Sequence, residues 1–88
     1  MGAGSVGAPP PVGGRPFWPG RVIVWVDPWR NEVRTVVKGG SPLLLPDDVA
    51  KRLVIVTHWM EPVGTDPYYH DEVYELTDEE FDAVVNGA

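Results

Sequence analysis

Glycine and proline are concentrated in the first twenty residues, and this limits where a fold can form. Six of the ten glycines and five of the ten prolines of the 88-residue chain lie there. The proline triplet at 9–11 favours extended polyproline II backbone, and the surrounding glycines add freedom. We therefore predict an extended or disordered N-terminal arm over residues 1–20 and a single small domain over residues 21–88.

A β-hairpin is predicted over residues 21–38. Valines at 22, 24 and 26 alternate with Ile23 and Trp25, so both faces of this segment are apolar, as in a strand that is covered on both sides. The sequence Asp27-Pro28 through Asn31 has turn chemistry. A second alternating run over residues 33–38 completes the hairpin.

The segment that follows predicts a strand-to-helix junction. Residues 43–45 are three leucines that fit a short strand, and Pro46 fits the first helical position. Acidic residues at 47 and 48 suit the positive end of a helix dipole. A helix that ends near Leu53 has only two turns, so its apolar face must dock on the sheet.

Two further strands and a second helix complete the predicted order. Residues 53–60 are β-branched and aromatic and predict the strongest strand, with Trp59 in the core. A loop is predicted over 61–67 and a strand over 68–76. Thr77 followed by Glu80 predicts a capping box, and Asn86-Gly87 predicts the end of the C-terminal helix.

These elements predict an α+β fold. The sheet is small and mostly antiparallel, with one short internal helix and a C-terminal helix. No apolar run is long enough for a membrane-spanning helix, and no basic region followed by an apolar stretch predicts a signal peptide. Without cysteine the chain has no disulfide, thiolate zinc site or cysteine nucleophile.

Charge is divided unevenly along the chain. The net charge is −6, but residues 1–38 hold five basic and two acidic residues, whereas residues 39–88 hold two basic and eleven acidic residues. Such a chain can attract copies of itself or a partner with complementary patches. The acidic half would repel phosphates, so we expect no direct binding to nucleic acid.

Aromatic residues supply the candidate interface. Phe17 and Trp18, between two prolines, resemble an anchor that seats in a groove of this domain or of a neighbour. Trp29 and Arg30 at the hairpin turn have the composition of an interface hot spot, and so do the tyrosines after Pro67. The predicted protein-interface residues are Phe17, Trp18, Trp29, Arg30, Tyr68 and Tyr69.

No residue pattern predicts catalysis. His58 and His70 with nearby acids form the one metal-like set, but its spacing matches no known ligand pattern. The carboxylates at 72 and 75 have no predicted pocket, so charged strand edges explain them better. We predict no enzyme activity, no catalytic or metal-binding residues and no cofactor.

The stretch from Gly39 to Leu53 resembles small proteins encoded among the head genes of tailed bacteriophages. The shared pattern is a glycine turn, an apolar strand, Leu45-Pro46, the acids at 47 and 48, then Ala50 and Leu53. The resemblance implies a capsid-associated or other virion-structural protein. It brings no catalytic residues.

Two functions from different classes are therefore expected. The first is a non-enzymatic structural or assembly protein that acts by protein–protein contact as a phage virion accessory, binding capsid or other virion proteins or forming a homo-oligomer or lattice. Its location would be the virion, or the cytoplasm if the chain is not viral, with no membrane partner. The alternative is an acidic inhibitor in which eight acids within residues 66–82 block a basic site on a nucleic-acid-processing protein.

Overall fold

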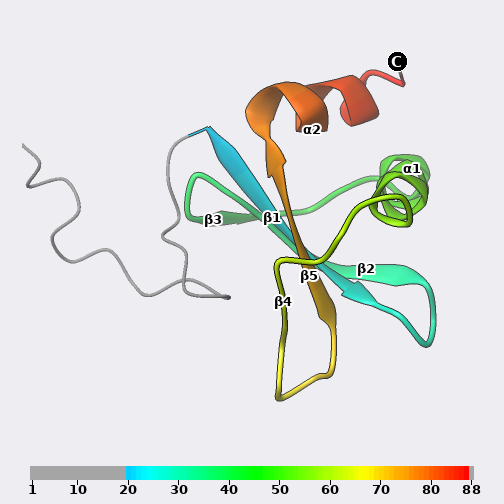
Figure 1. The fold of residues 1–88 in the computed structure, drawn as a ribbon. Helices are drawn as coiled ribbons and strands as arrows, with labels where there is room; N and C mark the ends of the chain where they lie inside the picture. Colours follow the sequence, from blue (N-terminus) through cyan, green and yellow to red (C-terminus); the bar gives the residue numbers. More distant parts are fainter. Residues whose placement is uncertain (1–19, 88) are drawn as a thin grey trace, which may run out of the picture.

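A computed structural model describes residues 20–87 as a five-stranded sheet with two helices (Figure 1). In chain order the elements are β1 (Arg21–Asp27), β2 (Glu32–Lys38), β3 (Ser41–Leu43), α1 (Asp47–Thr57), β4 (Gly64–Thr65), β5 (Glu72–Thr77) and α2 (Asp78–Val85). The strand order is β3-β2-β1-β5-β4, and every neighbouring pair is antiparallel. The predicted α+β class is confirmed. Apart from Gly20, the predicted arm lies outside the described residues.

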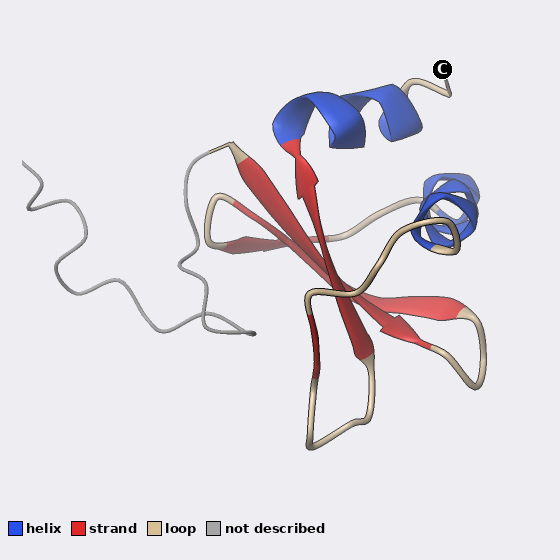
Figure 2. Ribbon diagram, in the orientation of Figure 1, coloured by secondary structure: helices blue, strands red, loops and turns tan. Residues whose placement is uncertain are grey.

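Both helices pack on the same face of the sheet (Figure 2). The central strand β1 turns its three valines at 22, 24 and 26 toward this face, where they meet Leu53 of α1 and Phe81 of α2. Alternation along the strand makes this possible, because successive side chains point to opposite faces. Each large apolar side chain buried here contributes roughly 1.5–3 kcal/mol relative to exposure. The remaining members of the core are Val36, Tyr74, Leu76 and Val84.

A β-bulge in the hairpin lets two valines of β2 that are three residues apart face the same side of the sheet. Trp25 pairs with Thr35 but Val26 pairs with Val33, so Arg34 is the extra residue. Val33 and Val36 both pack against the core, although three residues separate them. A regular strand would put them on opposite faces, and the extra residue removes that conflict. The predicted hairpin is present, and its bulge turns Arg34 away from the helices.

The strand predicted over residues 53–60 is wrong, because α1 continues through this segment to Thr57. The buried side chains Val49, Leu53 and Thr57 recur every fourth residue, which is the spacing of one helix face. Burial of that face outweighs the strand propensity of the β-branched run at 54–56. Pro46 is the N-cap of α1, one position before the predicted place.

Smaller shifts affect three other elements. Trp59 lies beyond the end of α1 and is 83% exposed, so its predicted core position is wrong. The last strand begins at Glu72 rather than 68, since residues 66–70 form a turn, and β4 lies within the predicted loop. The short strand before α1 covers Ser41–Leu43, so Leu44 is left exposed.

The C-terminal helix follows its prediction. The Thr77 hydroxyl accepts a hydrogen bond from the Glu80 amide (3.0 Å), and the Glu80 carboxylate accepts one from the Thr77 amide (2.8 Å). The apolar residue before the cap, Leu76, is buried together with Phe81. At the other end the Arg52 guanidinium donates hydrogen bonds to the carbonyls of Val84 and Val85, both at 3.0 Å. These bonds tie α1 to the last turn of α2.

Replacing the cap residue tests this helix. Thr77→Ala removes the acceptor for the Glu80 amide, so we expect a loss of about 1 kcal/mol in the free energy of unfolding. Urea denaturation monitored by circular dichroism measures this change. Thr77→Ser keeps the hydroxyl and is the matched control, expected to retain nearly all of the stability. Equal midpoints for the alanine variant and the wild type would contradict the capping role.

Tyr74 gives the core a sensitivity to high pH. Its ring is buried in the core, and its hydroxyl donates a hydrogen bond to Glu72 Oε1 at 2.7 Å. Burial, followed by the hydrogen bond to Glu72 and the charge of that residue, raises the pKa of Tyr74 to about 12. The ordinary value is about 10. Because the folded state holds the proton more tightly, this contribution to stability is complete below about pH 10 and is lost as the pH rises to about 12.

Removal of the Tyr74 hydroxyl therefore changes the response to alkali. We expect the melting temperature of the wild type to fall relative to that of Tyr74→Phe as the pH rises from about 10 to about 12. Melting curves recorded across this range measure the difference. Tyr68→Phe, altered at an exposed ring, is the matched control. A constant difference between wild type and Tyr74→Phe across the range would contradict the assignment.

Candidate protein-interaction surface

The turn between β1 and β2 is built by an aspartate-proline pair. Asp27 Oδ1 accepts hydrogen bonds from the backbone amides of Trp29 (2.9 Å) and Arg30 (3.1 Å). Pro28 fixes its own φ near −65°, and Asn31 closes the turn with a φ of 56°, a left-handed conformation that asparagine tolerates well. The local sequence thus fixes the turn through its own backbone hydrogen bonds.

The turn before β5 repeats this design. Asp66 Oδ1 accepts hydrogen bonds from the amides of Tyr68 (2.8 Å) and Tyr69 (3.3 Å). His70 occupies the place of Asn31 and has a φ of 62°. We call residues 27–31 and 66–70 the two Asp-Pro turns. Each places an aromatic residue directly after proline.

The aromatic residues of the two turns face solvent. Trp29 is 90% exposed and Tyr68 is 80% exposed, whereas Tyr69 is exposed by about half, at 53%. The rings of Tyr68 and Tyr69 meet edge to face, with centroids 4.8 Å apart. Because the turn backbone is held by its own carboxylate, these rings are presented on fixed supports rather than on free loops.

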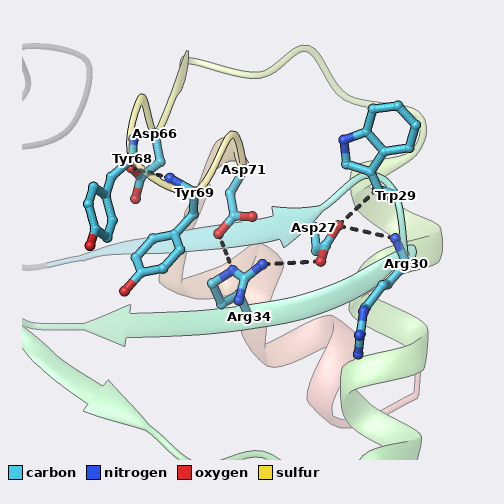
Figure 3. Close-up of polar contacts among 8 residues, drawn as sticks. All are labelled: Asp27, Trp29, Arg30, Arg34, Asp66, Tyr68, Tyr69 and Asp71. Carbon is cyan, nitrogen blue, oxygen red and sulfur yellow. Dashed lines mark hydrogen bonds and ion pairs between the residues drawn. The ribbon is translucent and has the colours of Figure 1, made fainter.

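Arg34 joins the two turns (Figure 3). Its Nη2 lies 3.1 Å from Asp27 Oδ2, and its Nε donates a hydrogen bond to Asp71 Oδ2. The guanidinium carbon also lies 5.0 Å from the centre of the Tyr69 ring. The hydrogen bond to Asp71, together with the charges of Asp71 and Asp27, raises the pKa of Arg34. One cation therefore fixes the hairpin turn, the start of β5 and one aromatic ring.

Asp71 is the buried partner in this bridge. Its side chain has no exposed area, and its Oδ1 has no hydrogen-bond partner among the described residues. A carboxylate removed from water needs a compensating charge, and Arg34 provides it. The bulge of β2 is what brings Arg34 to this position. The register between β1 and β2 thus decides whether Arg34 reaches Asp71 and Asp27, and so how the two turns are held.

The structure gathers four of the six predicted interface residues at one end of the sheet. Trp29 and Arg30 lie on one side of Arg34, and the two tyrosines lie on the other (Figure 3). Phe17 and Trp18 lie outside the described residues. Asp27 was predicted as a turn residue, but the supporting roles of Arg34, Asp66 and Asp71 were not predicted. The repeated Asp-Pro-aromatic pattern was a signal that could have found Asp66, whereas no short pattern identifies Arg34 and Asp71.

A second exposed tryptophan lies beside the hairpin turn. Trp59 and Ile55 sit one helical turn apart, and Ile55 is also exposed. Together with Asn31, Val54 and His58 they line a shallow hollow of about 250 Å³. Sequence reasoning missed this surface because it placed residues 53–60 in a strand. The hollow adds Ile55 and Trp59 to the exposed apolar side chains at this end of the molecule.

The histidines take separate places. His58 caps the end of α1 and packs edge to face on Trp59 at 5.6 Å, whereas His70 closes the second Asp-Pro turn. Within residues 20–87 no three histidine, cysteine or acidic side chains lie close enough together to hold a metal ion. In the same range, neither helix is long and apolar enough to cross a membrane.

Most of the acids in residues 66–82 are engaged within the chain. Asp66 and Glu80 bond to backbone amides, and Glu72 accepts from Tyr74. The ion pairs join Asp71 to Arg34, Glu75 to Arg21 (3.3 Å) and Asp82 to Lys38 (3.8 Å). Six of the eight acids named for the inhibitor hypothesis therefore have a partner on this chain. The three ion pairs offset part of the negative charge of the segment, whereas the hydrogen bonds of the other three acids leave their charge in place.

Substitution of Arg34 tests the bridge between the turns. Arg34→Ala leaves Asp71 buried without its cation, so we expect a clear fall in the melting temperature and loss of order in both turns. Arg30→Ala is the matched control, because Arg30 is an exposed arginine in the same hairpin. Melting curves and amide chemical shifts of residues 27–31 and 66–70 measure the effect. Equal losses from both alanine variants would contradict the bridge.

Comparisons of the chain with protein-family models, with curated proteins and with solved structures find no match. Function is therefore inferred from the surface itself. That surface offers rigidly supported aromatic rings at one end of a small sheet, next to a hollow on α1.

Proposed function

We propose that this protein is a non-enzymatic structural or assembly protein that binds protein neighbours, the first of which is a second copy of itself. The observation that carries the proposal is the exposure of aromatic side chains on the two Asp-Pro turns. Tryptophan, tyrosine and arginine are the residues most enriched at the energetic centres of protein interfaces. Here all three types lie within two rigid turns.

The support of these rings favours binding over chance exposure. In each turn an aspartate carboxylate accepts hydrogen bonds from backbone amides, and Arg34 links both turns to Asp71. A turn whose backbone is already held loses little backbone freedom when a partner covers it. The turns are therefore suited to form the centre of an interface, with Arg30 at its rim.

The proposed setting is that of a virion accessory protein. Support comes from the resemblance of residues 39–53 to small proteins encoded with phage head genes, since this stretch forms the glycine turn, β3 and the start of α1. In such a setting each copy would contact capsid or other virion proteins through the same aromatic surface. The alternative of an acidic inhibitor has less support, because three of its eight acids form ion pairs within the chain and three more accept hydrogen bonds there.

Self-association of the full chain tests the proposal. We expect sedimentation velocity to show a sedimentation coefficient that rises with concentration. The double variant Trp29→Ser/Tyr68→Ser should remain a monomer with an unchanged melting temperature, because both rings are exposed in the isolated chain. Leu44→Ser is the control: it also removes a fully exposed apolar side chain, but outside the turns and the hollow, and should associate like the wild type.

Salt distinguishes the two hypotheses. Contacts between apolar rings should persist when NaCl is raised from about 0.1 to about 1 M, whereas binding through acidic residues should weaken steeply as the screening length falls. A wild-type chain that stays monomeric at every concentration would overturn the proposal. Association that the turn variant leaves intact would overturn it as well.

A further inference from the structure

The positive charge of Arg30 restricts which surface of a second copy can receive the first Asp-Pro turn. Arg30 directly follows Trp29 in this turn and is exposed. Within residues 20–87 its side chain forms no hydrogen bond or ion pair, so it can reorient freely when a partner approaches. A surface that covers Trp29 must therefore combine an apolar contact with a carboxylate whose charge is not already neutralised.

The hollow beside α1 supplies the apolar contact. Ile55 is 62% exposed and Trp59 is 83% exposed, and both side chains line this hollow of about 250 Å³. They lie one helical turn apart, so they form a continuous apolar wall. An aromatic ring that enters the hollow removes both side chains from water, which is favourable in proportion to the apolar area covered.

A second hollow adjoins the first and contains the carboxylate of Glu72. Its volume is also about 250 Å³, and it shares Asn31, Val54 and His58 with the first hollow. The Tyr74 hydroxyl donates a hydrogen bond to Glu72, but no lysine or arginine within residues 20–87 forms an ion pair with it. A bond from a neutral hydroxyl leaves the carboxylate charge in place, so this hollow holds an anion without a cation.

Two other exposed apolar places are less suited to receive the turn. The guanidinium of Arg34 already lies 5.0 Å from the centre of the Tyr69 ring, beside Tyr68. At the end of α2, Arg52 donates a hydrogen bond to the carbonyl of Val85. A second arginine would be repelled at either place, whereas Glu72 would attract it.

We propose that the first Asp-Pro turn of one copy docks in the two hollows beside α1 of a second copy. Trp29 then covers Ile55 and Trp59. Arg30 reaches into the adjoining hollow and forms an ion pair with Glu72, while its aliphatic part lies along the apolar wall. The inference rests on the proposed function, since it names the surface of the second copy that receives the turn.

The docking turn and the receiving hollows lie side by side on each chain, because Asn31 of the turn lines both hollows. One patch thus carries a projecting ring with a cation and a hollow with an anion. This is the self-complementarity that an interface between two identical patches requires. A second copy is therefore the partner that this patch fits.

A charge exchange between two variants tests the pairing. Arg30→Glu and Glu72→Arg should each raise the dissociation constant for self-association by at least about tenfold, because like charges then meet. An equimolar mixture of the two variants should associate again, since every turn then meets a hollow of opposite charge. Sedimentation velocity measures the three samples, and circular dichroism checks that each variant is folded.

A smaller change protects the test against unfolding by the larger arginine side chain. Glu72→Gln removes the charge but keeps an acceptor for the Tyr74 hydroxyl, and it should weaken self-association. The matched control is Glu79→Gln, the same change at an exposed residue of α2, which should associate like the wild type.

Association of Arg30→Glu at the wild-type level would overturn the inference. A mixture of folded variants that associates no better than its components would do so too. Should Glu72→Arg not fold, equal association of Glu72→Gln and Glu79→Gln would overturn it instead. In each case the proposed function stands if Trp29→Ser/Tyr68→Ser still abolishes association, whereas a wild-type chain that never associates would overturn both.

Discussion

The bridge made by Arg34 is the interaction on which the functional end of the molecule depends. Asp71 is fully buried directly before β5, and burial of a carboxylate is costly unless a positive charge or hydrogen bonds compensate it. Arg34 supplies that charge from β2 and contacts Asp27 of the intervening strand as well. The bridge thus spans three strands and holds the two Asp-Pro turns in a fixed relation. It adds to the β1–β5 pairing, which joins Val26 to Glu72 directly beside the two turns.

The helices have a different role. They cover one face of the sheet, and Arg52 links α1 to the last carbonyls of α2. This arrangement leaves the turn end available for other contacts. The division explains why the aromatic side chains segregate: Phe81 and Tyr74 belong to the core, whereas Trp29, Trp59 and Tyr68 lie on the surface.

The elements that sequence reasoning predicted well are those governed by local chemistry. The hairpin follows from alternation and a turn sequence, and the cap at Thr77 follows from three-residue spacing. The extent of α1 could not be predicted in this way. Its β-branched residues at 54–56 favour a strand locally, and only burial of Leu53 and Thr57 against distant segments favours the helix.

The candidate surface shows the same limit. Trp29, Arg30 and the two tyrosines were identified by residue type and by neighbouring prolines. Their supports were not, because Asp71 lies 37 residues from Arg34 and the pairing depends on sheet order. The bulge that aims Arg34 has no local signature beyond the three-residue spacing of Val33 and Val36. Long-range register, which no short pattern encodes, thus decides how the predicted residues are held.

The two edge strands limit how copies of the chain can pair at high local concentration. β3 has three residues, one of them Pro42, and β4 has only two. Short borders of this kind offer few backbone groups to a neighbouring sheet, and proline removes one donor. Copies packed at high local density would therefore resist strand-by-strand growth into fibres. The molecule can therefore bind neighbours through its exposed aromatic side chains, while its edge strands offer few backbone hydrogen bonds.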